Sequence, residues 1–255
     1  MLRSRTNNRE LGRIPFQPFL RHRKNANEHN GSRPSGQSGA RVLGLHRRQE
    51  DCDGRHGIIL FAFVIGHLLG NLQVFEGPAK LNAYGAFLHS IGEFLWPVRI
   101  ILLIAVTLHI VATVQLALRK KRARPVGYSV KKSIASSYAS RTMYWSGPIV
   151  LAFIIFHLLH LTAGYIHPGA AYIEGDVYHN VVSGFQVWWV SLAYIVAVSL
   201  LGLHLRHGLW SMFQSLGIHQ PQHTLRLKKA AMVIALLITL GYLSIPISVL
   251  LGLVR

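Results

Sequence analysis

Four histidines that each stand inside an apolar stretch are the side chains best suited to chemistry in this sequence. They are His67 in FVIGHLLGN, His109 in AVTLHIVAT, His157 in FIIFHLLH and His204 in LLGLHLRHGLWS. A polar ring at membrane depth needs a partner, so a histidine in such a stretch is by default a candidate functional residue. Imidazole nitrogens bind metals and carry protons, so either chemistry could explain these four histidines.

The elements that must position these histidines are apolar stretches long enough to cross about 30 Å of hydrocarbon. Five stretches qualify: Gly57 to Phe75, Phe94 to Leu118, Thr142 to Ile166, Val187 to Phe213 and Ala230 to Leu253. The chain of 255 residues is 51% hydrophobic yet carries a formal net charge of +18, so its charge should lie in loops and tails. The sequence predicts an all-α integral membrane protein with five transmembrane helices in one domain, residues 57–255.

The connections between these spans differ in charge. Residues 119–141 and 226–229 are rich in Lys and Arg and lack acids, whereas every acid after position 56 lies in the other two connections: Glu76, Glu93, Glu174 and Asp176. Short basic loops remain in the cytoplasm, so we expect a multi-pass protein of the bacterial cytoplasmic membrane with its N-terminus inside and its C-terminus outside. We predict no nucleic-acid partner, because the basic run is confined between two spans.

This topology sorts the four histidines by depth. The first and third spans run outward and carry His67 and His157 in their later halves, so both rings lie toward the outer side. The second and fourth run inward, which places His109 and His204 toward the cytoplasm. Two facing imidazoles are the axial set of a six-coordinate haem, and helical bundles build such sites in their cores. The sequence therefore predicts two b-type haems, in a bundle formed by the first four helices.

Cysteine usage limits how a haem could be held. Cys52 is the single cysteine, which excludes an internal disulfide, a cysteine-ligated cluster and the C-x-x-C-H signature of covalent haem attachment. The haems are therefore expected to be noncovalent.

Other uses of intramembrane histidine are open. A single buried histidine is often a hydrogen-bonded helix contact. Zinc would require three or four ligands at one depth, and a proton pathway usually recruits intramembrane carboxylates, which these spans lack. Four histidines placed singly on successive spans at matched depths favour the haem interpretation.

Further polar and small residues accompany the four histidines. His160 and His207 follow His157 and His204 by three residues, and we interpret them as cofactor neighbours or interfacial residues rather than ligands. His89, His167 and His179 are expected in outer loops, where they would be solvated. Three arginines near span ends could pair with haem propionates or extend to lipid headgroups: Arg99, Arg141 and Arg206. Four glycines near the histidines could let a porphyrin or a helix approach: Gly66, Gly70, Gly202 and Gly208.

Residues 1–56 differ from the rest of the chain. They are polar, show no apolar periodicity and lack the apolar core of a secretory signal peptide, so we expect a disordered basic tail. A one-nucleotide shift in the codons for RRQEDCDGRHG permits a peptide that runs directly into the first span. We therefore hypothesise that residues 1–56 are an out-of-frame translation product.

From about Gly57 onward the chain resembles the cytochrome b membrane-anchor subunit of succinate dehydrogenase/fumarate reductase, in its five-span, two-haem form. The motifs that carry the resemblance are GHLLGN, LHI, SSYASRTMYWSG, FHLLH, DVYHNVVSGF and LHLRHGLWS. They are spread over about four-fifths of the chain. In that family the first helix pairs with the third and the second with the fourth, which here gives His67 with His157 and His109 with His204.

The resemblance implies a function. A flavoprotein subunit would oxidise succinate, an iron–sulfur subunit would relay the electrons, and this chain would pass them through two haems to menaquinone or ubiquinone in the lipid membrane. The His109/His204 haem would be proximal to the partner subunits and the His67/His157 haem distal. Outer-side candidates for the quinone site are Asn71, Glu76, Asn82 and Glu93.

Two other functions compete with this one. The cytochrome b subunit of a formate dehydrogenase or hydrogenase also uses bis-histidine haems, although the GLWS and DVYHN motifs argue against it. A haem-free transporter or structural anchor is the alternative from a different class.

Overall fold

The computed structural model describes residues 56–122, 138–218 and 220–255, and every regular element in these ranges is helical. Five helical segments are long and apolar enough to cross a membrane, as the hydropathy pattern predicts. They are His56–Glu76, Gly92–Arg119, Trp145–Thr162, Trp188–Ser215 and Pro221–Leu250. Their bounds differ from the predicted ones by at most nine residues, the largest shift being at the start of the last span. The predicted tail falls on residues outside the described ranges, except for His56.

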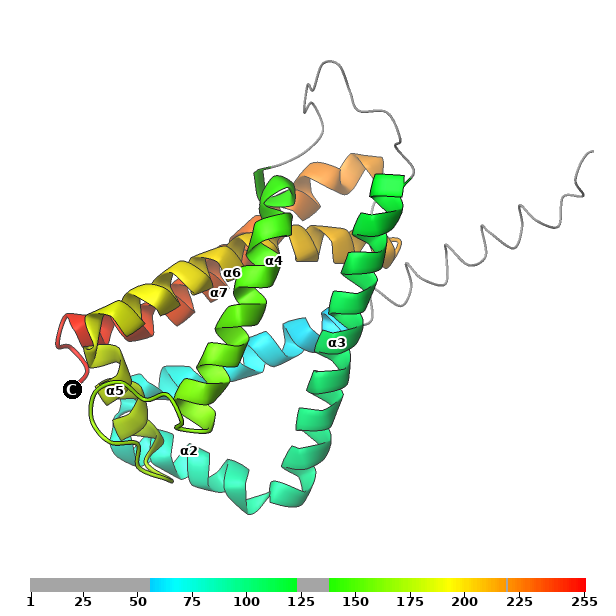
Figure 1. Ribbon diagram of the computed structural model, residues 1–255. Coiled ribbons are helices and arrows are strands. Elements are labelled where there is room, and N and C mark those ends of the chain that lie inside the picture. Colours follow the sequence, from blue (N-terminus) through cyan, green and yellow to red (C-terminus); the bar gives the residue numbers. More distant parts are fainter. Residues whose placement is uncertain (1–55, 123–137, 219) are drawn as a thin grey trace, which may run out of the picture.

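The centre of the molecule is an antiparallel pair of long helices, α6 (Trp188–Ser215) and α7 (Thr224–Leu250), which pack along their lengths (Figure 1). The 3₁₀ turn η3 (Pro221–His223) leads into α7. Gly202 allows close packing between these helices, because a Cβ there would collide with the Thr239 side chain. The helix α4 (Tyr138–His157) packs on the other side of α6.

The second span behaves differently from the others. It forms α3 (Gly92–Arg122), which is the least buried of the five spans and contacts the short helix α2 (Pro78–Ser90). Figure 1 shows α3 standing apart from the α6–α7 pair along most of its length. Large apolar side chains such as Phe94, Leu103 and Ile104 are exposed on it. Exposed apolar helices of this kind are compatible with a multi-pass membrane protein.

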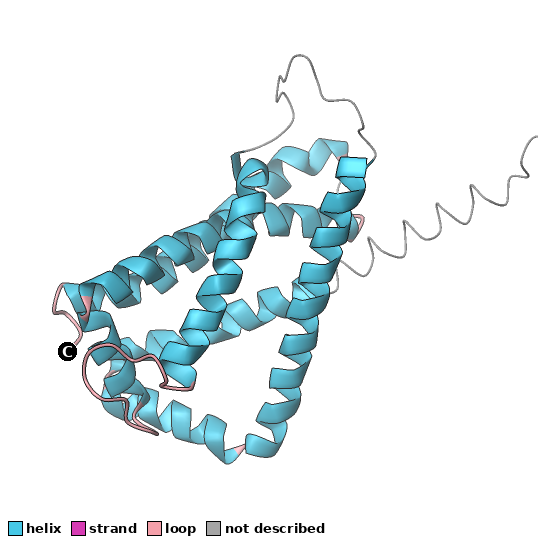
Figure 2. Cartoon of the chain, viewed as in Figure 1, coloured by secondary structure: helices cyan, strands magenta, loops and turns pink. Residues whose placement is uncertain are grey.

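One end of the molecule contains short helices where the sequence suggested loops. The helix α2 follows the 3₁₀ turn η1 (Leu72–Glu76), and α5 (Val177–Gln186) follows a non-helical connection, residues 163–176 (Figure 2). The expectation that His89 and His179 lie in loops is therefore wrong, since they belong to α2 and α5. Residues 180–185 of α5 are all buried, and Val181, Val182 and Phe185 belong to the core cluster at this end.

The C-terminus lies at the same end of the molecule as α5. The Tyr178 hydroxyl donates to the backbone oxygen of Arg255 at 3.0 Å, and Val254 belongs to the core cluster formed around α5. The four acids of the two non-basic connections occupy the elements at or near this end. The predicted sidedness of the membrane stays a prediction.

Candidate functional site

The structure brings the four intramembrane histidines together in the two pairs expected from their depth. The ring centroids of His67, on the first span, and His157, at the end of α4, are 5.7 Å apart. Those of His109 on α3 and His204 on α6 are 5.9 Å apart. We call His67 and His157 the outer pair and His109 and His204 the inner pair, after the predicted topology. Each pair joins two different spans, so each could clamp a ligand between helices.

The separation within each pair can be compared with what a shared metal requires. A metal–imidazole bond is about 2.0 Å long and the ring centre lies about 1.1 Å beyond the nitrogen, so two trans imidazoles on one ion have centroids about 6 Å apart. The separations of 5.7 and 5.9 Å are close to that value, and the ring planes cross at 83° and 68°. The centroid separation of both pairs is therefore compatible with two imidazoles on one metal ion.

The inner pair has two further features that suit a flat cofactor. The Nδ1 atom of His204 is buried and has no hydrogen-bond partner among the described residues. This nitrogen therefore makes no hydrogen bond that stabilises the fold. Gly208 lies one helical turn beyond His204, on the same side of α6. A Cβ at Gly208 would meet no atom within 4 Å. A ring system beside His204 could therefore approach the helix backbone at this glycine.

The glycines near the histidines divide into two groups. Gly66 and Gly208 face open space, whereas a Cβ at Gly70 would lie 2.7 Å from the Tyr84 ring and one at Gly202 would collide with Thr239. Gly70 and Gly202 therefore serve contacts between elements of the protein. Only Gly66 and Gly208 leave room that the described residues do not fill.

The outer pair lies in aromatic surroundings. His67 stacks on Phe63, with centroids 5.3 Å apart and planes at 14°, and Tyr242 of α7 lies 6.3 Å away. The Tyr242 hydroxyl donates to the backbone oxygen of Val64 at 2.7 Å. The Asn71 amide donates to the backbone oxygen of His67 at 2.7 Å and lies 3.3 and 3.4 Å from its two ring nitrogens. Near-equal distances to both nitrogens place this amide over the ring.

The arrangement of the described side chains does not favour a zinc site. Within residues 56–122, 138–218 and 220–255, no three side chains of His, Cys, Asp or Glu gather as a metal-binding group. A structural or catalytic zinc site requires at least three protein ligands. Two-ligand coordination of an iron that a porphyrin already holds has no such requirement.

The propionate candidates occupy different environments. The Arg99 guanidinium lies over the Trp96 ring, 5.3 Å from its centroid, at the start of α3. Arg206 is half-buried on α6, two residues after His204. The backbone of Arg141 belongs to α4, but its side chain is outside the described residues. Of the three, Arg206 is nearest in sequence to a candidate ligand.

The four quinone candidates lie at or near the end of the molecule that carries α2 and α5, but they make different contacts. Asn71 covers the His67 ring, and Glu76 pairs with Lys80 at 4.0 Å on the surface. Glu93 is exposed in the first turn of α3. Asn82 links α2 to α5, because its amide nitrogen donates to Asp176 and its oxygen accepts from the Tyr178 backbone, both at 2.9 Å. The atoms of Asn82 are therefore engaged in the fold.

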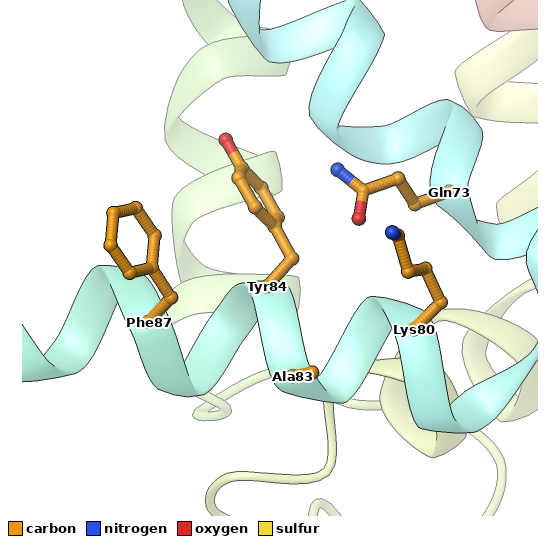
Figure 3. Close-up of a pocket in the computed structure, with 5 residues that line it drawn as sticks. All are labelled: Gln73, Lys80, Ala83, Tyr84 and Phe87. Carbon is orange, nitrogen blue, oxygen red and sulfur yellow. The ribbon is translucent and has the colours of Figure 1, made fainter.

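A pocket of about 360 Å³ opens beside these residues (Figure 3). It is lined by Gln73, Lys80, Ala83, Tyr84 and Phe87, which is a different set from the four quinone candidates. Lys80, Tyr84 and Phe87 project from the same side of α2, and Gln73 reaches toward Lys80 from η1. The Tyr84 ring packs against Gly70, one turn beyond His67, so the pocket lies next to the outer pair. It combines two aromatic rings with amide, ammonium and phenol groups.

Asp176 supports this end of the molecule as the N-cap of α5. Its carboxylate accepts from the His179 backbone and from Asn82, each at 2.9 Å, and these two hydrogen bonds hold its pKa below the usual range. Asp176→Ala should therefore lower the stability at neutral pH by about 1 kcal/mol, the usual cost of losing such a cap. Unfolding of the purified protein in detergent measures this, with Glu174→Ala as the control at a neighbouring exposed acid.

The same substitution has an expected pH dependence. A carboxylate with a lowered folded-state pKa contributes its full stabilisation above the unfolded-state pKa of about 3.9 and loses it as the pH falls through the folded-state value. The difference between wild type and Asp176→Ala should therefore be constant from pH 8 to pH 5 and disappear in stronger acid. A difference that grew on acidification would contradict this role of Asp176.

Several residues of the outer site were not expected from the sequence. Tyr194 on α6 hydrogen-bonds both His157 and His160. His160 is completely buried, so the interfacial place that was one of the two expectations for it is wrong. His167 is not simply solvated, because its ring nitrogens lie 2.9 and 3.0 Å from the backbone oxygens of Ala170 and Asn180. A tyrosine in an apolar span was the available signal, since a buried hydroxyl usually has a partner.

No protein-family model, curated protein or solved structure matches this chain. The function must therefore be argued from the residues and their geometry.

Proposed function

We propose that this chain is a di-haem cytochrome b that anchors succinate dehydrogenase/fumarate reductase in the membrane and exchanges electrons with a quinone. The observation that carries the proposal is the pairing of four intramembrane histidines into two sets whose ring centroids are 5.7 and 5.9 Å apart. Two such pairs, joined by different helices of one bundle, suit two noncovalent b-type haems. The motif resemblance in the sequence supports the assignment to this particular class of complex.

The haems would supply reversible one-electron transfer. The chain's own residues have separate tasks. His67 and His157 would hold the outer haem and His109 and His204 the inner one, while the open space at Gly66 and Gly208 would admit the ring edges. Arg206 can reach a propionate or the headgroups at its end of α6. The basic connections would form the docking face for the iron–sulfur and flavoprotein subunits.

The quinone headgroup would bind at the outer end, in the pocket lined by Gln73, Lys80 and Tyr84. Quinone carbonyl oxygens accept hydrogen bonds, and amide, ammonium and phenol groups donate them. The rings of Tyr84 and Phe87 provide the apolar surface that a planar headgroup needs. Glu76, paired with Lys80 at the rim, is placed to exchange protons with water.

A reduced-minus-oxidised absorption spectrum of the purified membrane protein tests the proposal. We expect b-type bands and, after extraction, two haems for each chain without any covalent link. Absence of b-type bands would favour a haem-free transporter or structural anchor. Co-purification is the second measurement, since recovery of a hydrogenase or formate dehydrogenase in place of a flavoprotein and an iron–sulfur subunit would overturn the assignment.

A further inference from the structure

A chain of three polar side chains begins at the half-buried His157 and leads away from the outer pair to two buried residues. The Nδ1 atom of His157 lies 3.3 Å from the Tyr194 hydroxyl, and the same hydroxyl lies 2.9 Å from Nδ1 of His160. Tyr194 is 5% exposed and His160 is 0% exposed. Water therefore does not compete for these contacts from the bulk, and one hydroxyl serves both rings.

The local backbone makes this arrangement possible. The turn that follows α4 is the π-helix η2 (Leu158–Thr162), in which the Ala163 amide donates to the oxygen of Leu158 at 2.8 Å. A π-turn is wider than an α-turn and is frequent at functional sites. It separates the rings of His157 and His160, which are three residues apart, so that the Tyr194 hydroxyl fits between them. The fold thus departs from a regular helix immediately after His157.

The aromatic neighbours hold Tyr194 in place. Its ring meets the edges or faces of Phe153, Phe156 and Phe185 with centroids 4.9, 5.9 and 4.7 Å apart. His160 stacks on Phe156 at 5.5 Å, with planes at 17°. This packing therefore fixes the position of the Tyr194 hydroxyl before any ligand binds.

The direction of the hydrogen bonds follows from the role proposed for His157. A neutral imidazole that binds iron through Nε2 carries its proton on Nδ1, so His157 must donate and the Tyr194 oxygen must accept. The Tyr194 hydroxyl proton is then directed to Nδ1 of His160, which must accept. This tautomer of His160 carries its proton on Nε2, an atom that is buried without a partner among the described residues. A buried N–H without a partner is unfavourable, and it is the consequence of His160 accepting through Nδ1.

We infer that Tyr194 is a positioning residue that fixes the tautomer of His157 and sets the reduction potential of the outer haem, with His160 as its supporting acceptor. This inference rests on the proposed function. A hydrogen bond from a ligating histidine to an acceptor orients its ring and makes the ligand more basic. A more basic ligand stabilises ferric iron over ferrous iron. The Tyr194 hydroxyl therefore lowers the potential of the outer haem relative to an otherwise identical site without it.

Spectroelectrochemical titration of the holoprotein tests this inference with the variant Tyr194→Phe. We expect both haems to be retained and the potential of the outer haem to rise. At a fixed ambient potential the ratio of reduced to oxidised outer haem should increase by about three- to tenfold, where tenfold corresponds to 59 mV for a one-electron couple. The inner haem should titrate as in the wild type.

The chain offers a matched control in Tyr242→Phe. Tyr242 is another tyrosine beside the outer pair, half-buried and 6.3 Å from the His67 ring, but its hydroxyl donates to the Val64 backbone rather than contacting a histidine nitrogen. The same chemical change should leave both potentials unaltered. Equal shifts in the two variants, or no shift in Tyr194→Phe, would overturn the inference.

A second variant tests the inference even if Tyr194→Phe does not fold. His160→Phe removes the acceptor while keeping an aromatic ring against Phe156, and it should raise the outer potential less than Tyr194→Phe does. A shift in the opposite direction would overturn the inference. A wild-type protein without b-type bands would instead refute the proposed function itself, so the two failures are distinguishable.

Discussion

Replacing His204 with alanine should remove the inner haem and leave the outer one in place. An iron held by two axial imidazoles loses half of its protein ligands in this variant, and the remaining His109 cannot complete the site. The reduced-minus-oxidised absorbance should fall by about half, because two haems contribute to it. The matched control is His207→Ala on the same helix, which should retain both haems. Equal haem loss from the two substitutions would show that the wrong histidine was assigned.

Double substitutions make the pairing itself testable. If His109 and His204 hold one iron, the double alanine variant should lose no more haem than either single variant, because both changes affect the same site. His157 and His204 belong to different pairs, so their double alanine variant should contain no haem. Any other pattern would contradict the assignment of the 5.9 Å contact to one site and the 5.7 Å contact to another.

Filling the open space at Gly208 should also remove the inner haem. Gly208 lies one turn from His204, and a Cβ there would meet nothing within 4 Å, so the branch point of a longer side chain can be accommodated. If a porphyrin edge occupies this space, Gly208→Leu excludes it, and the inner haem should be lost while the helices still pack. Haem content and the thermal unfolding of the purified protein measure the two effects separately.

The control for this substitution is Ala193→Leu, which adds similar bulk at an exposed position of the same helix. It should keep both haems. Retention of two haems with unaltered spectra in Gly208→Leu would mean that the open space faces lipid.

The spans and their histidine pairs could be predicted because a membrane imposes simple constraints. A run of about 20 apolar residues specifies a helix, and the alternating direction of successive helices fixes the depth of each residue. Depth alone was therefore enough to match His67 with His157 and His109 with His204. The roles of these residues as haem ligands stay predictions.

Depth does not determine how each helix is rotated about its own axis. For this reason the sequence could not distinguish Gly66 and Gly208, which face open space, from Gly70 and Gly202, which face protein. It also could not reveal that Tyr194 points at His157 and His160, because these residues are 37 and 34 positions apart and meet only after α4 and α6 pack. The π-turn at Leu158–Thr162 has no evident sequence signature.

The short helices at the outer end were missed for a related reason. The N-cap of α5 is made locally, by Asp176 and the His179 backbone, but Asn82, 94 residues away, also donates a hydrogen bond to Asp176. Local propensity does not contain a contact of such long sequence separation, so the DVYHN segment was expected to be a loop. The outer pocket depends on the same elements, since α2 provides most of its lining.

The loose packing of α3 has a thermodynamic consequence. This helix is the least buried of the five spans, yet it places the His109 ring centroid 5.9 Å from that of His204. Part of the binding free energy of a ligand held by both rings would therefore stabilise the docking of α3 against the rest of the bundle. Ligand binding and the docking of α3 would then be one linked equilibrium. The α6–α7 pair can form from its own contacts, whereas the attachment of the second span would depend on cofactor supply in the cell.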